Sequence, residues 1–217
     1  MEEIRKLVRG YLAFTEEYQS EEFAAYRERA ARQQSPKVMV IACSDSRVNP
    51  AIITKAELGE VFTVHNVANL VPPYEEGHNT HHSTSAAIEF AVCHLKVHHI
   101  VVLGHSQCGG IRALMEGNAL KHDDHYSFIE PWMNIANVAK EKVMHQDYAS
   151  QDARIHACEK EALLVSLENL RTFPWVAQAI DEEKLYIHAW YFDVASGNIT
   201  AFDPTDQCFK PLKQLYG

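Results

Sequence analysis

Three continuous apolar runs mark the first half of the chain, at 38–43, 61–64 and 100–103. A run that does not alternate with polar residues is typical of a strand that is buried on both faces of a parallel sheet. Between the second and third runs, apolar residues recur at helical spacing over 83–96. We therefore predict a strand–helix–strand unit whose two strands lie parallel in one sheet.

The second half of the chain predicts three more helices and then two more strands, over 109–116, 128–144, 150–172, 185–194 and 199–202. Ser196-Gly197-Asn198 separates the two strands and is short enough to turn the chain back on itself, so the final strand is expected at an antiparallel edge. The predicted fold class is α/β: a mostly parallel central β-sheet with flanking helices, an antiparallel edge strand and an N-terminal helical arm.

The N-terminal arm is polar and helix-prone over residues 2–32, with aromatic side chains at intervals, and Ser35-Pro36 ends the helix. We divide the chain into an arm, 1–34, and an α/β domain, 35–217. An amphipathic helix that carries aromatic side chains needs an apolar surface to lie on, which either its own domain or a second subunit can provide.

The net charge excludes some classes of partner. The 217 residues contain 20 Lys and Arg against 29 Asp and Glu, a formal charge of −9, which disfavours nucleic acids and anionic membrane surfaces. No apolar run approaches the roughly 20 residues that span a bilayer, and the first residues have neither a signal nor a transit pattern. We expect a cytoplasmic protein, in which five widely spaced cysteines do not form a disulfide framework.

Residues suited to metal binding follow two of the predicted strands. Cys43 ends the first strand, whereas His105 and Cys108 follow the third. Sites in open α/β sheets form beyond the carboxyl ends of the strands, so adjacent parallel strands would bring these side chains together. Two sulfurs and one imidazole nitrogen suit Zn²⁺, and three protein ligands leave a fourth position open, as in catalytic zinc sites.

Asp45 and Arg47 lie two and four residues after Cys43, close enough to reach the metal or its ligands. Asp45 could be a fourth ligand that closes the site. Alternatively, it could pair with Arg47 and accept a hydrogen bond from zinc-bound water. Arg47 favours the second arrangement, because a charge-assisted pair holds the carboxylate away from the metal.

Four sequence blocks occur in an order and spacing that point to a known family: CSDSR (43–47), NVANLVPPY (66–74), AAIEFAV (86–92) and HSQCGG (105–110). Over roughly residues 30–205 the chain resembles the β-class carbonic anhydrases, and within them the plant-like, open-site subclass. The resemblance implies reversible hydration of carbon dioxide to bicarbonate by zinc-bound hydroxide. It also implies a homodimer or a higher homo-oligomer of dimers, in which the arm clasps the partner.

The resemblance also implies roles for individual residues. Cys43, His105 and Cys108 would bind zinc, and Asp45 and Arg47 would be the catalytic pair. The substrate pocket would be formed by Gln34, Phe62, Val67, His81 and the backbone N–H of Gly109. Of these, Gln34 and Phe62 would come from the neighbouring subunit.

The chain departs from the family at His65, which stands where an arginine is usual. Another subclass binds bicarbonate at a non-catalytic site built from Trp, Arg and Tyr, and the corresponding residues here are Val40, His65 and Phe192. Since none of the three matches, we expect the open form of the site at neutral pH. His65, His81 and His82 are candidates for carrying the released proton to buffer.

Two other functions fit the same residues. One is the hydrolysis of CS₂ or COS, because access to the pocket rather than the metal ligands separates these substrates from carbon dioxide. The other is a non-catalytic zinc-binding module, in which Asp45 closes the metal permanently and the acidic surface binds a partner. Arg47 argues against the second, because a structural zinc site gains nothing from an arginine that detaches its ligand.

Overall fold

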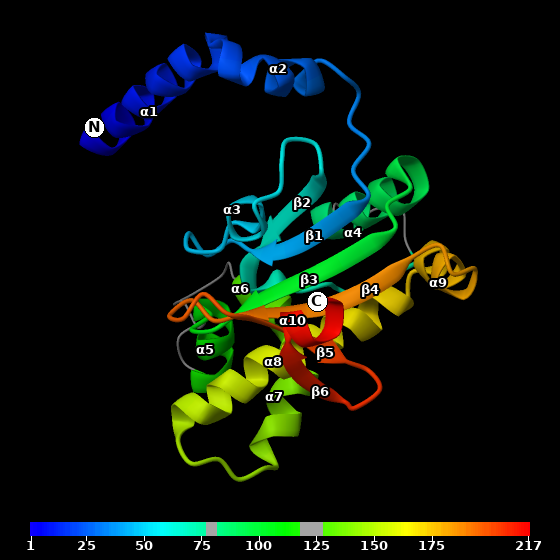
Figure 1. The fold of residues 1–217 in the computed structure, drawn as a ribbon. Helices are drawn as coiled ribbons and strands as arrows, with labels where there is room; N and C mark the ends of the chain where they lie inside the picture. Colours follow the sequence, from blue (N-terminus) through cyan, green and yellow to red (C-terminus); the bar gives the residue numbers. More distant parts are fainter. Residues whose placement is uncertain (77–81, 118–127) are drawn as a thin grey trace.

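The computed structural model describes residues 1–76, 82–117 and 128–217. Within them, the strands are β1 (Val38–Cys43), β2 (Val61–Asn66), β3 (His99–His105), β4 (Tyr186–Phe192), β5 (Ile199–Asp203) and β6 (Cys208–Pro211). They form one sheet in the order β2-β1-β3-β4-β5-β6 (Figure 1). The first four strands pair in parallel and the last two pair antiparallel, which confirms the predicted fold class.

The edge of the sheet differs from the prediction. β5 runs antiparallel to β4 as expected, but β6 pairs with the other side of β5, so residues 199–202 do not form the edge. β6 has four residues and ends at Pro211, a residue that cannot donate a ladder hydrogen bond. So short a strand carries too little pattern to be predicted from the sequence.

The helices are α1 (Glu2–Gln19), α2 (Ala24–Ala30), α3 (Pro50–Thr54), α4 (Ser83–Glu89), α5 (Gly109–Glu116), α6 (Ile129–Met133), α7 (Asn137–Met144), α8 (Gln151–Arg171), α9 (Pro174–Asp181) and α10 (Leu212–Tyr216). Four short 3₁₀ or π segments accompany them: η1 (Glu21–Phe23), η2 (Val67–Asn69), η3 (Phe90–Leu95) and η4 (Asn134–Ala136). α3 was not predicted from the sequence, although Asn49 caps it by accepting from the N–H groups of Ala51 and Ile52.

Both faces of β1 and β3 are buried, which explains the apolar runs at 38–43 and 100–103. The run at 61–64 differs from the prediction, because β2 lies at the edge of the sheet and is only partly buried, with Thr63 exposed. Met39 and Ile41 of β1 face one way and pack in a cluster that includes Leu163 of α8. Val40 and Ala42 face the other way and belong to a separate cluster. A Cβ atom at Gly104 of β3 would lie 3.0 Å from the Leu163 side chain, so the glycine allows α8 to pack closely on the sheet.

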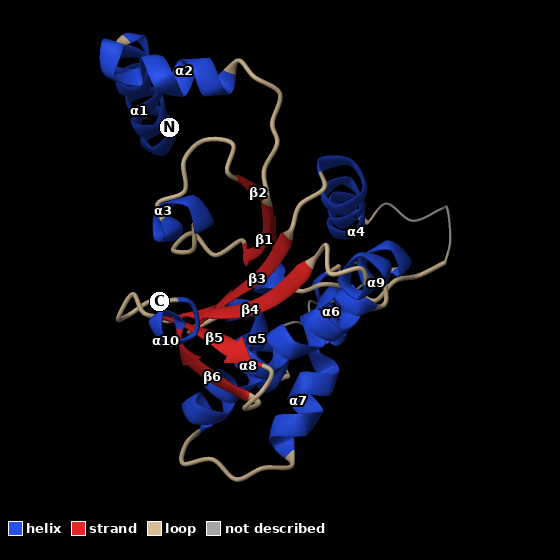
Figure 2. Cartoon of the chain, turned by 45° about the vertical axis from the view of Figure 1, so that its right-hand side comes forward, coloured by secondary structure: helices blue, strands red, loops and turns tan. Residues whose placement is uncertain are grey.

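The arm is not the single helix that residues 2–32 predict. The backbone at Ser20 is extended and separates α1 from η1 and α2, and the Arg27 guanidinium donates to the carbonyls of Tyr18 and Ser20 at this corner. Figures 1 and 2 both show α1 and α2 apart from the sheet. No helix in the described part of the chain has the length and apolar character needed to cross a bilayer.

Candidate metal centre

The strand order places the predicted ligands at one end of the sheet. β1 and β3 are parallel neighbours, so Cys43 at the end of β1 lies next to the end of β3 at His105. Gln107 then adopts a left-handed conformation with φ of 60°, and Cys108 stands at the cap of α5. This turn brings the chain back toward Cys43.

Cys43, His105 and Cys108 converge in the interior of the protein. Their ligand atoms all lie within 4.8 Å of one another, and all three residues are buried. Zinc bonds of about 2.0–2.3 Å in a tetrahedral site place ligand atoms roughly 3.4–3.8 Å apart, so small adjustments would complete the geometry. His105 Nδ1 lies 2.9 Å from the carbonyl oxygen of Ser106. That contact assigns the proton to Nδ1 and turns the lone pair of Nε2 toward the thiols.

The environment of His105 Nε2 is the feature of the site that best fits a bound metal ion. This nitrogen is buried and has no hydrogen-bond partner among the described residues. A buried polar atom without a partner is costly, and metal coordination would remove that cost. A set of two sulfurs and one imidazole nitrogen is also a donor set that zinc prefers. The residues present therefore fit the predicted ion.

The two thiols have different acidities. The pKa of Cys43 is lowered to about 4, mainly because Cys108 donates a hydrogen bond to it, with a further contribution from His105. The same hydrogen bond raises the pKa of Cys108, and burial adds to this effect. Cys43 is therefore ready to act as a thiolate ligand, whereas Cys108 would release its proton when a cation binds.

Asp45 is held beside these ligands by Arg47. The guanidinium of Arg47 binds both carboxylate oxygens, with Nε 2.9 Å from Oδ1 and Nη2 2.8 Å from Oδ2. These hydrogen bonds keep the pKa of Asp45 well below its usual range. Asp45 Oδ2 lies 4.0 Å from His105 Nε2. The ionised carboxylate thus faces the ligand set while Arg47 restrains it.

The backbone around Gly109 and Gly110 adjoins Val67. A Cβ atom at Gly110 would lie 3.1 Å from Val67 Cγ1, so glycine is needed for this close approach. At Gly109 a Cβ atom would meet nothing within 4 Å. As the first residue of α5, Gly109 has an N–H group without an acceptor in its own helix. Val67 itself is 39% exposed, so an accessible apolar side chain lies beside Gly110 in the first turn of α5.

Other predicted pocket residues lie elsewhere. Gln34 precedes β1 and lines a pocket of about 740 Å³ with Pro36 and Trp190, whereas the metal ligands follow the opposite end of that strand. Phe62 pairs with Met39 near the amino end of β2. The single chain therefore does not bring Gln34 or Phe62 to the ligands. His81 lies outside the described residues.

The remaining residues that the sequence singled out are distributed around the sheet. His65 lies beside the ligands, and its Nδ1 is 3.0 Å from the carbonyl oxygen of Cys43. His82 is exposed and precedes α4. Val40 and Phe192 share one apolar cluster on the sheet face.

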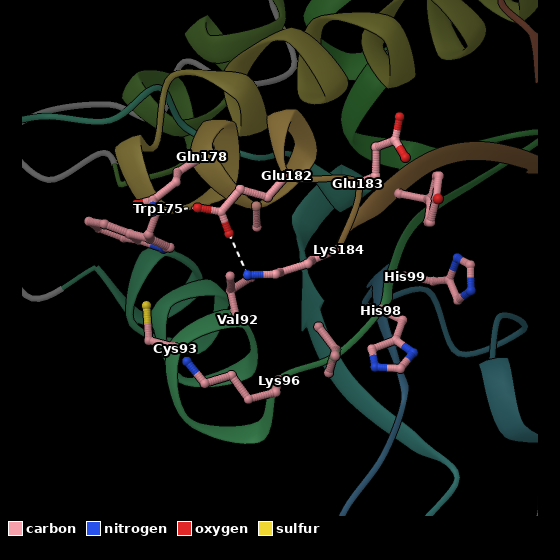
Figure 3. Close-up of a pocket in the computed structure, with 13 residues that line it drawn as sticks. Val92, Cys93, Lys96, His98, His99, Trp175, Gln178, Glu182, Glu183 and Lys184 are labelled. Carbon is pink, nitrogen blue, oxygen red and sulfur yellow. Dashed lines mark hydrogen bonds and ion pairs between the residues drawn. The ribbon is translucent and has the colours of Figure 1, made fainter.

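A separate pocket of about 680 Å³ opens at the amino ends of β3 and β4 (Figure 3). Lys96 and His98 line it, and Glu182 bridges Gln178 and Lys184 across one wall. It contains none of the predicted site residues.

Two residues that were not predicted from the sequence hold the segment 106–108, called the ligand loop because it carries Cys108. Gln107 accepts from Arg47 through its side-chain Oε1 and its backbone carbonyl, both at 3.2 Å. Glu159 of α8 accepts the N–H of Cys108 at 2.8 Å. The sequence pattern does mark Glu159 as unusual. It lies at helical spacing between Ile155 and Leu163, on the buried face of α8, where an apolar side chain is expected.

The fold and the site together define an α/β protein with a buried group of residues that could hold a metal ion, and comparisons with known proteins identify its family. A family profile described as carbonic anhydrase matches residues 38–199. A carbonic anhydrase of Pseudomonas aeruginosa is 35% identical over 211 residues, covering 97% of this chain and 93% of that protein. Beta carbonic anhydrase 5, chloroplastic, of Arabidopsis thaliana is 40% identical over 189 residues, which is 84% of this chain and 59% of that protein.

Solved structures agree with these relatives. The structure of the β-carbonic anhydrase CcaA covers 97% of this chain and 92% of its own, with 28% identity and a TM-score of 0.85. A tetrameric β-carbonic anhydrase from Sordaria macrospora covers 97% of this chain and 100% of its own, with 26% identity and a TM-score of 0.78. The chain belongs to the β-carbonic anhydrases, enzymes that interconvert carbon dioxide and bicarbonate.

Proposed function

We propose that Cys43, His105 and Cys108 hold a catalytic zinc ion and that the chain uses this site to hydrate carbon dioxide reversibly. The observation that carries the proposal is the convergence of the three ligand atoms within 4.8 Å, beside the carboxylate of Asp45. When bound there, zinc would act as a Lewis acid that makes water available as a nucleophile near neutral pH. The protein would position the ion, balance its charge and exclude bulk water from the substrate pocket.

Asp45 and Arg47 act as a pair in this proposal. Because Arg47 keeps Asp45 ionised, the carboxylate can accept a hydrogen bond from the reacting water and orient its lone pair toward the carbon atom. Arg47 engages both oxygens of Asp45 and so opposes direct ligation of the metal by this residue. The open form of the site follows from this restraint.

Val67 and Gly109 supply the substrate side of the site. Carbon dioxide is apolar, so the exposed Val67 side chain offers it a suitable surface. The N–H of Gly109, at the positive end of α5, would donate to one substrate oxygen, on which negative charge develops during attack.

The complete pocket needs a second copy of the chain. Gln34 and Phe62 lie toward the amino ends of β1 and β2, so in this proposal they reach the metal centre of a partner subunit. The arm supports such an assembly, because Ile4, Leu7 and Tyr11 of α1 are exposed at the spacing of one helix face. A similar β-carbonic anhydrase, from Sordaria macrospora, is tetrameric.

Subunit complementation tests the shared pocket. Gln34→Ala removes the side chain that each subunit would contribute to its partner's site, and Asp45→Asn removes the carboxylate that each subunit contributes to its own site. Co-expression of the two variants forms heterodimers. If Gln34 serves the partner's site, each heterodimer contains one intact site, and random pairing restores about a quarter of the wild-type activity. If the mixture stays at the mean of the two separate variants, Gln34 does not act across the interface.

The substrate is tested by comparing carbon dioxide with CS₂ and COS on the zinc-loaded protein. Stopped-flow measurement with a pH indicator is expected to show fast proton release from carbon dioxide, which metal removal abolishes. Fast turnover of CS₂ or COS without carbon dioxide hydration would instead select the hydrolase alternative. Absence of all three reactions would leave a non-catalytic zinc-binding module.

We also propose that the protein works in the cytoplasm. All five cysteines are free thiols, including the exposed Cys208, which suits a reducing compartment. Fractionation of the native cells would test this, and recovery of the protein from an oxidising compartment would contradict it.

A further inference from the structure

A buried carboxylate lies behind the ligand loop. Glu159 is 4% exposed and comes from the middle of α8, where its neighbours on the same helix face are apolar. Its Oε1 accepts the N–H of Cys108 at 2.8 Å, and its Oε2 accepts the hydroxyl of Tyr191 at 2.6 Å. Burying a carboxylate is costly unless its oxygens are hydrogen-bonded. Apolar packing alone therefore does not account for an acid at this position.

Arg47 binds the carbonyl side of the peptide group whose N–H donates to Glu159. The Gln107 carbonyl and the Cys108 N–H belong to one planar peptide group. Arg47 Nη2 donates to that carbonyl at 3.2 Å, and Glu159 accepts from that N–H. The peptide is thus held between a cation and an anion, directly after Gln107 takes its left-handed conformation with φ of 60°.

The orientation of this peptide determines where the Cys108 sulfur points. Rotation of the plane between Gln107 and Cys108 would carry Cβ and Sγ of Cys108 away from Cys43 and His105. Tyr191 of β4 braces Glu159 in turn, and its hydroxyl lies 2.8 Å from His156 Nδ1 at the edge of a polar cleft. The support for Cys108 therefore extends to α8 and β4.

We propose that Glu159 is a positioning residue of the metal centre, which together with Arg47 clamps the Gln107–Cys108 peptide and so fixes the direction of the Cys108 sulfur. The inference rests on the proposed zinc site. Residues that orient metal ligands typically change metal affinity by 10–100-fold when they are removed. Glu159 should therefore control how long the protein retains its metal.

Two substitutions separate the charge of Glu159 from its shape. Glu159→Gln keeps one oxygen for the Cys108 N–H, and its amide can donate to the Tyr191 hydroxyl, which can then donate to His156. Glu159→Ala removes the acceptor altogether. Glu161→Gln is the matched control, because Glu161 lies on the same helix and pairs with Lys142 instead of the ligand loop.

The experiment measures the rate at which zinc-loaded full-length protein loses zinc to excess chromophoric chelator. We expect Glu159→Ala to release zinc about 10–100-fold faster than wild type, Glu159→Gln to be intermediate and Glu161→Gln to match wild type. Cobalt-substituted protein gives a second readout: the sulfur-to-cobalt absorption should shift in both Glu159 variants and stay unchanged in Glu161→Gln.

Wild-type release rates and unshifted cobalt spectra in both Glu159 variants would overturn the proposal. If Glu159→Ala does not fold, Glu159→Gln decides the question, supported by Tyr191→Phe, which removes the brace on Oε2 and should also speed zinc release. Neither readout involves carbon dioxide. A zinc-loaded wild type that fails to hydrate carbon dioxide would refute the proposed function alone, whereas unchanged zinc release would refute the clamp alone.

Discussion

Two side-chain clusters on the same sheet, one around His105 and one around His188, differ in how the ring nitrogens of their histidines are paired. At the carboxyl end of β3, His105 uses Nδ1 for the Ser106 carbonyl, and its buried Nε2 has no hydrogen-bond partner among the described residues. On the sheet face, His99 Nδ1 lies 3.1 Å from His188 Nε2, and His188 Nδ1 lies 3.0 Å from the Tyr216 hydroxyl. In the second cluster both ring nitrogens of His188 have partners, whereas in the first Nε2 of His105 has none among the described residues.

The two clusters also have opposite electrostatics. Burial by itself lowers the pKa of His105, but the neighbouring Cys43 outweighs burial and the pKa is raised. His188 has no such anion beside it, so burial, with a contribution from His99, lowers its pKa to about 4. The comparison shows that burial does not make a histidine a ligand. What distinguishes His105 as a candidate ligand is a buried nitrogen without a hydrogen-bond partner among the described residues, next to Cys43, whose thiol has a lowered pKa.

The largest expected effect comes from removing a ligand. Cys43→Ala should lower bound zinc from about one ion per chain to background and abolish carbon dioxide hydration, because two remaining ligands cannot hold the ion. Metal analysis and a stopped-flow assay measure both quantities. Cys208→Ser, at an exposed cysteine far from the ligands in the sheet, is the control. Stoichiometric zinc in Cys43→Ala would remove this residue from the site.

A smaller effect is expected at the acid beside the ligands. Asp45→Asn should retain zinc but lower kcat by about 10²–10⁴, the usual contribution of a positioned proton acceptor. Full zinc content together with a lowered kcat would show that Asp45 acts in the reaction and is not a metal ligand. An Asp45→Asn variant that lost its zinc would show that the carboxylate closes the metal.

His188 should affect stability instead of activity. Its pKa is lower in the folded chain than the usual 6.5, so the folded state binds fewer protons than the unfolded state near pH 5. This contribution is present above pH 6.5 and is lost as the pH falls toward 4. It is on the order of 1–2 kcal/mol after discounting for partial exposure.

Urea unfolding at pH 7 and pH 5 measures this effect. His188→Gln should show a smaller loss of stability between the two pH values than wild type, at similar carbon dioxide hydration. Equal losses in the two proteins would mean that His188 does not titrate as its surroundings indicate.

The smallest effect is expected at the end of that cluster. Tyr216→Phe removes the hydroxyl beside His188 Nδ1 and should cost about 0.5–1.5 kcal/mol of unfolding free energy. Thermal unfolding measures this cost, and the rate of hydration should not change. A loss of activity would show that the face of the sheet communicates with the metal centre.

Much of the fold could be predicted because β1 and β3 are buried on both faces, which leaves long apolar runs in the sequence. The break in the arm could not be predicted, since it depends on hydrogen bonds from Arg27 to carbonyls seven and nine residues earlier. β6 was missed because its pairing partner, and not its own pattern, makes it a strand.

The candidate site divides in the same way. The grouping of Cys43 with His105 and Cys108 follows from strand ends and could be predicted from position alone. Glu159 contacts Cys108 across 51 residues of sequence, and no local pattern encodes that contact. Gln107 lies inside one of the family's sequence blocks, but its hydrogen bonds to Arg47 depend on its own left-handed backbone conformation, which no residue pattern indicates.

A zinc titration of the metal-stripped protein, with carbon dioxide hydration measured at each step, tests whether the Cys43, His105 and Cys108 site is a catalytic zinc site. The site described here predicts that activity rises linearly and stops at about one zinc ion per chain. Full zinc occupancy at Cys43, His105 and Cys108 without carbon dioxide hydration would contradict the account, as would activity that does not depend on added zinc.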